Sequence, residues 1–257
     1  MSNYNVVITG SAVGIGRGVA IAYAGLGATI VALDIDDQEN EITKQLVTDA
    51  GGTCLTFNCD VGDRLAVKAV FDSLSLNKID LLLNNAAVWN NTTLTGGDYD
   101  QQTQAYDHAM GSCVFGAFYC SMAAVPLLEL APEPNIINII TDHVKVGHYI
   151  TGAPATGYDC AKFSLWRLTE SWAVELADKG IRVNGLCFGA TDTPMLRGVS
   201  PEAAERGMVP ADIADAVMRV VNQGAGGDTG TSYFFGGGPT PRATSLEQIA
   251  NLRDNLL

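Results

Sequence analysis

Apolar residues follow two alternating patterns along this chain. Short runs rich in Val, Ile and Leu predict buried β-strands, and longer segments with apolar residues at every third or fourth position predict helices. We expect strands at residues 6–9, 29–34, 53–58, 79–84, 135–141, 182–187 and 231–235. We expect helices from a glycine-rich turn after the first strand to about Leu26, and at residues 38–50, 64–74, about 99–130, 157–179 and 211–222.

The regular alternation of strand and helix predicts a parallel β-sheet. Parallel strands need crossover connections, and helices in those connections cover both faces of the sheet. The run at 79–84 is nearly continuous in leucine, which is typical of a strand covered on both faces. No linker or repeat interrupts the pattern, and 257 residues are enough for one well-buried domain. We therefore predict the α/β class, with a doubly wound sheet in a single domain spanning 1–257.

Composition and charge narrow the class of function. Hydrophobic residues make up 47% of the chain and the formal net charge is −13, which excludes a disordered chain and a basic nucleic-acid-binding surface. We expect no nucleic-acid partner, and no membrane partner because no run of about 18 apolar residues is evident. The six cysteines form no Cys-x-x-Cys pair and no Cys/His cluster has metal-ligand spacing. We expect a cytoplasmic protein with reduced thiols and no metal.

The turn after the first predicted strand is rich in glycine. It reads Thr9-Gly-Ser-Ala-Val-Gly-Ile-Gly16 and joins that strand to a helix. Glycine lets the backbone turn tightly and lets a pyrophosphate approach the amide groups at the helix start. We therefore expect a dinucleotide here. The predicted contacts come from Gly10, Ser11, Val13, Gly14, Ile15 and Gly16.

Asp34 ends the second predicted strand, where a carboxylate can accept hydrogen bonds from ribose hydroxyls and repels a 2′-phosphate. The next three residues carry no positive charge, and Arg17, the nearest cation, lies within the first predicted helix. This pattern favours NAD over NADP. The alternative is that Asp34 only begins the turn before the next helix.

Two further segments lie at strand ends. Asp60 and Val61 follow the third predicted strand, and Asn85-Ala86-Ala87 follows the fourth. Ligands of open α/β sheets bind at the carboxyl ends of the strands. We therefore expect both segments to continue the nucleotide groove.

Tyr158 and Lys162 are four residues apart, which places them on one face of the predicted helix. A phenol is a weak base at neutral pH, but a nearby ammonium and a positive nicotinamide ring would both lower its pKa. Such a tyrosine can exchange a proton with a substrate oxygen while hydride passes to or from the nicotinamide. We expect this pair to be catalytic.

Together these motifs resemble the short-chain dehydrogenase/reductase family over residues 6–238, including Arg182-Val-Asn and Gly189-Ala-Thr-Asp-Thr-Pro194. The resemblance implies a Rossmann-like fold of about seven parallel strands, usually in a homodimer or homotetramer. It implies that Gly189, Thr191 and Thr193 contact the nicotinamide side of the cofactor, and that Tyr158 and Lys162 contact the cofactor as well.

Two positions depart from the family's pattern. The family's catalytic serine is replaced by Thr141 at the end of the fifth predicted strand, followed by a longer loop, and the alternative is that Thr141 is only a strand-end residue. A threonine hydroxyl can make the same hydrogen bond. The family's helical asparagine falls at Cys113, which we interpret as a packed helix residue, or at Ser112 if the register differs by one.

Three loops would form the substrate pocket, at about 89–97, 142–156 and 195–208. The side chains expected in its wall are Trp89, Val144, Tyr149, Ile150, Met195 and Leu196. This lining predicts a compact apolar, cyclic or aryl substrate. His143 and His148 are expected to be exposed loop residues, and only Arg197 and Arg206 could dock an acyl carrier.

Residues 245–257 predict an amphipathic C-terminal helix with a capping box. It either packs on its own domain or caps a neighbouring subunit; we favour the second.

The function predicted is an NAD(H)-dependent oxidoreductase that interconverts a small secondary alcohol and its ketone, with Tyr158 as general acid/base. One alternative is a non-catalytic NAD-binding sensor of the same fold. A second is a non-redox relative such as a dehydratase or dehalogenase, which the intact glycine turn and Lys162 argue against.

Overall fold

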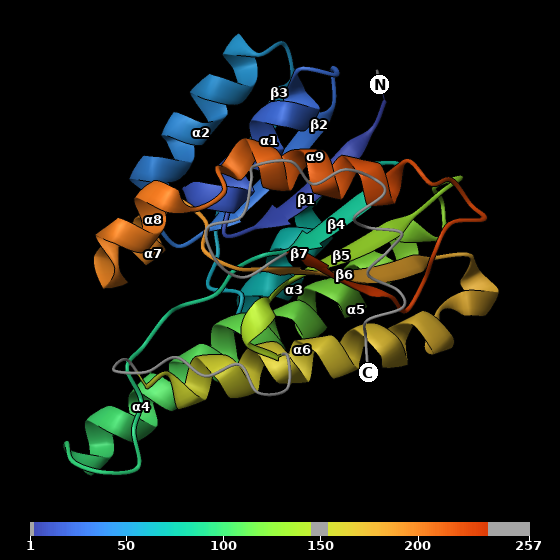
Figure 1. Ribbon diagram of the computed structural model, residues 1–257. Helices are drawn as coiled ribbons and strands as arrows, with labels where there is room; N and C mark the ends of the chain where they lie inside the picture. The colour runs from blue at the N-terminus through green and yellow to red at the C-terminus, as the bar shows by residue number, and fades with distance from the viewer. Residues whose placement is uncertain (1–2, 145–153, 236–257) are drawn as a thin grey trace.

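The computed structural model describes residues 3–144 and 154–235, and these form an α/β domain around one parallel sheet (Figure 1). The strand order is β3-β2-β1-β4-β5-β6-β7. The strands are β1 (Asn5–Thr9), β2 (Thr29–Asp34), β3 (Thr53–Asn58), β4 (Leu81–Asn84), β5 (Asn135–Thr141), β6 (Arg182–Phe188) and β7 (Ser232–Phe235). The predicted fold class is confirmed, and the predicted strand boundaries agree to within about two residues.

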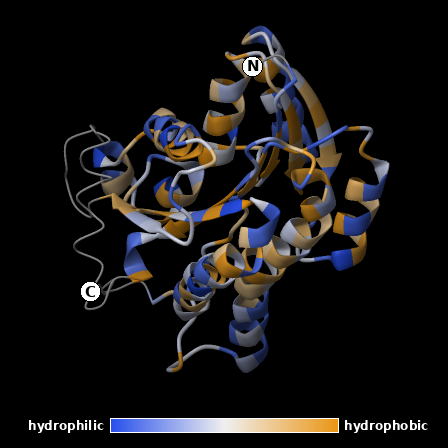
Figure 2. Cartoon of the chain, turned by 90° about the vertical axis from the view of Figure 1, so that its right-hand side faces the viewer, coloured by the Kyte–Doolittle hydropathy of each residue, from blue (hydrophilic) through white to orange (hydrophobic). Residues whose placement is uncertain are grey.

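Helices cover both faces of this sheet (Figure 1). One face packs against α1 (Gly14–Ala24), α2 (Asp37–Asp49) and α9 (Pro210–Val221), and the other against α3 (Arg64–Ser73), α5 (Gly116–Leu128) and α6 (Thr156–Glu175). Several helices carry hydrophobic and hydrophilic residues along the same ribbon (Figure 2), so each can turn an apolar side toward the sheet. Two buried apolar clusters result, one on each side of the sheet.

The sheet reverses its direction of growth beside β1. From β1 the chain builds outward to β2 and β3, then returns and places β4 on the other side of β1. At such a point the two connections leave in opposite directions, and a crevice opens at the carboxyl ends of the strands. The ends of β1, β4 and β5 therefore define where a ligand can enter the fold.

The predicted helix at 99–130 is interrupted. It consists of α4 (Tyr99–Met110), a π-helical turn (Gly111–Phe115) and α5, which already ends at Leu128. A π turn carries one extra residue and re-aims the side chains that it contains. Here the turn places Cys113 in the protein interior, 2% exposed.

The same stretch is unusually apolar. Tyr99–Leu128 is long and apolar enough to cross a membrane by length and composition. Its small residues Ala117, Cys120 and Ala124 are buried against the sheet, however, and belong to the core cluster on that face. The stretch is therefore the core helix of this domain.

Two short helices between β6 and α9 were not predicted. These are α7 (Pro194–Val199) and α8 (Pro201–Arg206), each of which begins with proline. The hydroxyl of Thr193 accepts a hydrogen bond from the Leu196 amide and caps α7. Helices this short have too few turns to show an apolar period. The predicted helix at 245–257 and the loop at 145–153 lie outside the described residues.

Candidate active site

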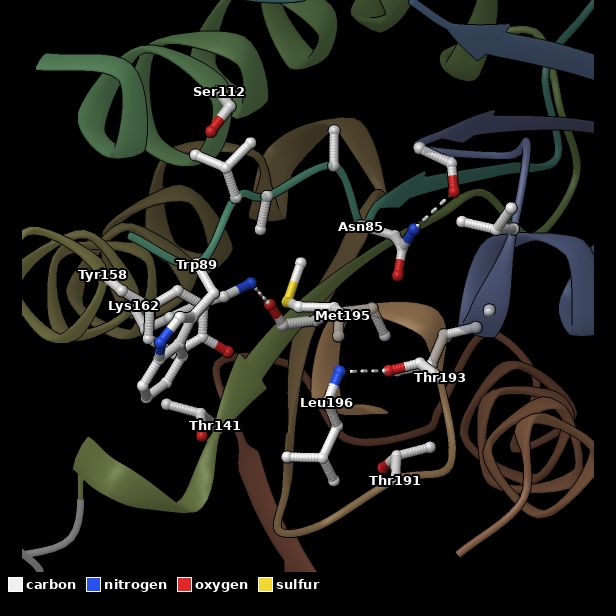
Figure 3. A pocket seen from close by; sticks show the side chains of 18 of the residues that line it. Asn85, Trp89, Ser112, Thr141, Tyr158, Lys162, Thr191, Thr193, Met195 and Leu196 are labelled. Atoms are coloured by element: carbon white, nitrogen blue, oxygen red, sulfur yellow. Dashed lines mark hydrogen bonds between the residues drawn. The ribbon is translucent and has the colours of Figure 1, made fainter. Parts of the chain in front are cut away.

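A cavity of about 800 Å³ opens at the carboxyl ends of the strands. Figure 3 shows part of its lining, with side chains from several strand ends directed into one space. The predicted site residues that line it are Gly10, Val13, Gly14, Ile15, Asp34, Asp60, Val61, Asn85, Ala86, Ala87, Thr141, Tyr158, Lys162, Gly189, Thr191 and Thr193. Segments far apart in sequence are thus brought into one continuous groove.

The glycine turn at one end of the cavity depends on backbone geometry that only glycine adopts easily. Gly10 and Gly14 have φ values of +66° and +57°. A Cβ on Gly16 would lie 2.1 Å from the carbonyl oxygen of Gly10, so a side chain there would force the turn open. The turn is therefore a compact backbone cradle at the start of α1, suited to an anionic phosphate group.

Two residues predicted to contact the cofactor do not line the cavity. The Ser11 hydroxyl is buried and donates to Oδ1 of Asn40 at 2.9 Å, so it ties the turn to α2. Gly16 lies behind the turn against Gly10. Both support the shape of the cradle from behind.

Asn85 braces this cradle. Its Nδ2 donates to the carbonyl oxygens of Thr9 and Gly10, each at 2.9 Å. The Thr9 hydroxyl in turn accepts hydrogen bonds from the amides of Asn85 and Ala86, each at 3.0 Å. Six polar atoms of two adjacent strand ends are thereby satisfied among themselves, which locks β1 against the segment after β4.

Asp34 lies beside the glycine turn, at the same end of the groove. Its Oδ2 accepts a hydrogen bond from the Ala12 amide at 2.9 Å, and its Oδ1 accepts one from the Asp36 amide at 3.0 Å. Arg17 points elsewhere, since its guanidinium contacts Glu39 Oε2 at 2.7 Å and the hydroxyl of Thr43 at 2.9 Å. A carboxylate therefore faces this part of the groove, and the nearby cation is held by α2.

Tyr158, Lys162 and Thr141 meet at the other end of the cavity. Lys162 is only 2% exposed, and its Nζ donates to the Ile139 carbonyl oxygen at 2.6 Å and lies 5.6 Å from the centroid of the Tyr158 ring. The Thr141 hydroxyl donates to the Phe188 carbonyl oxygen at 3.4 Å and lies near enough to the Tyr158 phenol to act on its pKa. The structure therefore brings together the three residues that the sequence proposed as catalytic.

The chain alone does not lower the pKa of the phenol, contrary to the simple expectation from its neighbouring lysine. Burial raises the pKa of Tyr158 well above its usual value, and nearby Cys113, Asp159 and Asp142 raise it further. The Thr141 hydroxyl acts in the opposite direction. The phenol is therefore protonated at neutral pH until positive charge is brought close to its oxygen.

Cys113 is a packed helix residue, as interpreted, and belongs to the buried apolar cluster on this face of the sheet. Burial raises the pKa of its thiol above the usual value, and the nearby Lys162 ammonium acts in the opposite direction. Ser112 instead lines the cavity and directs its hydroxyl to the Ala109 carbonyl oxygen at 3.4 Å. Cys113 thus contacts the lysine from the position that we assigned to it by register.

A buried polar chain holds α6 in register with the sheet. Asn138 of β5 accepts from Asn84 Nδ2 at 2.9 Å and donates to the Thr169 hydroxyl at 2.8 Å. Thr169 lies two turns beyond Lys162 on α6. Because buried amides without partners are costly, this chain specifies one position of α6 against β5 and so sets where Tyr158 and Lys162 face.

The substrate end differs from expectation at two positions. Val144 is buried in the apolar cluster on the face of the sheet that α3, α5 and α6 cover, and it does not line the cavity. His143 is not an exposed loop residue: it lines the cavity, and its Nδ1 lies 3.0 Å from Asp159 Oδ1. A short 3₁₀ turn at Asp142–Val144, not evident in the sequence, directs His143 inward. Tyr149, Ile150 and His148 lie outside the described residues.

The remaining wall was only partly predicted. Trp89, Met195 and Leu196 line the cavity, as expected. Val199, Ser200 and Ala203 also line it and belong to the predicted loop at 195–208. The lining residues that the sequence did not single out include Leu33, Ile35, Cys59, Val88, His108, Ile139, Ile140 and Phe188. Short helix α7 could have been found from Thr193-Pro194, a capping residue followed by proline, which is typical of a helix start.

Known proteins share both the sequence pattern and the fold. A family model described as enoyl-(acyl carrier protein) reductase matches residues 10–240. A 3beta-hydroxysteroid dehydrogenase of Mediterraneibacter gnavus is 30% identical over 251 residues, covering 96% of this chain and 87% of that protein. The crystal structure of a hydroxysteroid dehydrogenase from Escherichia coli has a TM-score of 0.76 at 26% identity, covering 91% of this chain and 95% of that one. Levodione reductase, at 24% identity with a TM-score of 0.80 and coverage of 91% and 96%, shares the fold.

Proposed function

The chain belongs to the short-chain dehydrogenase/reductase family, whose members here are oxidoreductases with a nicotinamide cofactor, and we propose that it is an NAD(H)-dependent enzyme that interconverts a small ring-containing secondary alcohol and its ketone. One observation carries the proposal. A single cavity joins the glycine cradle and Asp34 at one end to Tyr158 and Lys162 at the other.

The residues present fit a dinucleotide. A Cβ at Gly10 would lie 2.9 Å from the backbone of Ala86, so only a glycine lets the turn pack this closely against the segment after β4 and keep the shape of the cradle. Gly189, Thr191 and Thr193 also line the cavity and would hold the nicotinamide side of the cofactor. A bound nicotinamide would accept or supply the hydride.

The chain's own residues manage the proton. In ketone reduction the protonated phenol of Tyr158 donates to the substrate oxygen, and in alcohol oxidation the phenolate accepts the proton. Thr141 holds the substrate oxygen beside the phenol. Lys162, fixed on the Ile139 carbonyl, supplies positive charge next to the phenol and binds the cofactor.

Replacement of Asp34 with alanine tests the proposed preference for NAD. We expect the ratio of kcat/KM for NAD over NADP to fall about 100-fold, because the variant loses ribose hydrogen bonds and no longer repels a 2′-phosphate. Steady-state rates of NAD(P)H absorbance change give the ratio. Asp37→Ala is the matched control, since it removes an exposed carboxylate three residues away. An unchanged ratio in Asp34→Ala contradicts the assignment.

Thr141 variants test the replacement of the family serine. We expect Thr141→Val to lower kcat/KM by about 10- to 100-fold because the substrate oxygen loses one positioned hydroxyl, and Thr141→Ser to stay near wild type. Because the Thr141 hydroxyl lowers the pKa of the phenol, its loss should also move the inflection of the alcohol-oxidation rate to higher pH. Rates from pH 6 to 10 measure both effects. Wild-type behaviour of Thr141→Val would show that the hydroxyl is supplied elsewhere.

The wall of the cavity favours a compact uncharged substrate. Met195, Leu196 and Val199 of α7 present apolar side chains. Arg197 is paired with both carboxylate oxygens of Asp192, at 2.6 and 2.8 Å, and so is already engaged. This engagement disfavours the docking of an acidic acyl carrier. The hydroxysteroid dehydrogenases among the similar proteins agree with a ring-shaped alcohol.

A substrate panel tests the function directly. Cyclic and aryl secondary alcohols, and the corresponding ketones, are supplied with NAD(H) or NADP(H), and the absorbance of reduced cofactor is followed. We expect turnover of several ring compounds with NAD(H). Tight NAD binding without turnover of any member would instead support a cofactor-sensing protein of the same fold.

The outer faces of α5 and α6 support a homodimer or homotetramer. Phe115, Phe118, Met122, Phe163 and Val174 are exposed large apolar residues on these helices and the π turn before them. Phe118 and Trp172 connect the two helices, with ring centroids 6.5 Å apart. Contiguous apolar surface of this kind marks interfaces. Sedimentation velocity measures the assembly.

The six cysteines are free thiols, which fits the proposed cytoplasmic location.

A further inference from the structure

Three rings meet where the substrate would lie. The indole of Trp89 packs on Tyr158 with ring centroids 4.8 Å apart, and the His143 ring lies 5.8 Å from Trp89 and 6.1 Å from Tyr158. Figure 3 shows Trp89 beside Tyr158, above Thr141. The indole therefore occupies space next to the phenol that a substrate ring must enter.

The indole makes this contact at a cost. Its Nε1 is buried and has no hydrogen-bond partner among the residues that the structure describes. A buried N–H without an acceptor loses the hydrogen bond that water would give it, which disfavours this packing relative to one in which the N–H is paired. Contact with the two neighbouring rings offsets only part of that loss.

The neighbours of Trp89 are held more firmly than its side chain. Asn90 donates through Nδ2 to the Ala105 carbonyl at 3.1 Å, and Thr92 accepts through its hydroxyl from the Gly157 amide at 2.7 Å. His143 is oriented by Asp159. Rotation of the Trp89 side chain about its own bonds is therefore the motion that uncovers Tyr158 without moving the backbone.

The geometry points to Trp89 as a cover over Tyr158 that the substrate displaces, after which the freed indole N–H donates a hydrogen bond to a second polar atom of the substrate. The inference rests on the proposed function and refines its substrate class. The substrate is a ring ketone or alcohol that carries a second hydrogen-bond acceptor. The acceptor is neutral, such as an ether, hydroxyl or carbonyl oxygen, because the carboxylates of Asp142 and Asp159 flank this end and repel an anion.

Matched ketones and variants test the inference. Cyclohexanone is compared with tetrahydropyran-3-one and tetrahydropyran-4-one, in which one ring methylene is replaced by an oxygen. Trp89→Phe keeps an aromatic cover but removes the N–H, and Trp166→Phe removes an indole N–H on α6 outside the cavity. We expect Trp89→Phe to lower kcat/KM for at least one oxygen-containing ketone about five- to tenfold and to leave cyclohexanone within about twofold. Trp166→Phe should change neither.

Two outcomes overturn the inference. One is an equal effect of Trp89→Phe on all three ketones, and the other is no effect on any of them. Binding of the same ketones to the NAD⁺-loaded protein, measured by calorimetry, separates this inference from the proposed function. If the ketones bind without turnover and Trp89→Phe weakens only the oxygen-containing ones, the redox proposal fails and the role of Trp89 stands. If no ketone binds, the substrate class is wrong.

Discussion

Substitution of Tyr158 by phenylalanine is expected to lower kcat by about 1,000-fold or more, with the dissociation constant for NAD within about threefold of wild type. The change removes one oxygen atom and keeps the ring that packs against Trp89. A positioned acid or base contributes about 100- to 10,000-fold to such a reaction, and the proposal assigns that role to the phenol of Tyr158. Reduced-cofactor absorbance gives kcat, and calorimetry gives NAD affinity.

The control for this substitution is Tyr106→Phe. Tyr106 is a tyrosine of α4 that interacts with Cys160 and does not line the cavity. It should leave kcat unchanged. Turnover of Tyr158→Phe at the wild-type rate would refute the assignment of the general acid/base. Loss of NAD binding would mean that the substitution had damaged the cofactor-binding groove, and the fall in kcat would then not report on the missing phenol.

The direction of the pKa shift adds a pH dependence to the wild-type enzyme. Because burial raises the pKa of Tyr158, the protonated form that ketone reduction needs persists above neutral pH. Alcohol oxidation needs the phenolate, so its rate should increase with pH. The two directions of the reaction should therefore show opposite pH trends in the alkaline range, and both trends should disappear in Tyr158→Phe.

Substitution of Lys162 by methionine is the second change with a large expected effect. We expect kcat to fall by about 100- to 1,000-fold and NAD affinity to fall as well, because the variant removes the buried positive charge beside the phenol and leaves the Ile139 carbonyl without its donor. Methionine approximates the length and volume of the lysine stem, so the packing is retained. Kinetics, NAD titration and the thermal midpoint are measured together.

Lys179→Met is the matched control for Lys162. Lys179 is an exposed lysine that pairs with Glu129 on the surface, far from the cavity lining. Surface pairs of this kind contribute little, so neither activity nor the thermal midpoint should change appreciably. A Lys162→Met variant that kept turnover within about threefold of wild type would show that the phenol needs no ammonium, contrary to the electrostatic argument.

Much of the fold could be predicted because the relevant signals are local. The leucine run of β4 and the valine and isoleucine runs of β1 and β5 reflect strands buried on both faces. Where local signals were weak, prediction failed. Helices α7 and α8 are too short to show a period, and the π turn at Gly111–Phe115, which packs against α6, has no distinct pattern in the sequence.

The site was predicted unevenly for a related reason. Spacing on one helix was enough to pair Tyr158 with Lys162, and the order of strand ends was enough to place Asp34 and Asn85 in one groove. Contacts between distant segments carried no sequence signal. The proximity of Cys113 to Lys162 and the contact of His143 with Asp159 join residues that the chain separates by 49 and 16 positions.

The sequence by itself determined the alternation of strands and helices, the glycine cradle and the catalytic spacing, because each depends on backbone geometry and on residues a few positions apart. The tertiary structure alone decided what surrounds those groups. It buried Tyr158 and so raised its pKa, attached Lys162 to the Ile139 carbonyl, and set Trp89 against the phenol with an N–H that has no partner in the described part of the chain. Desolvation and hydrogen-bond satisfaction depend on which distant atoms exclude water, and that is known only once the chain has folded.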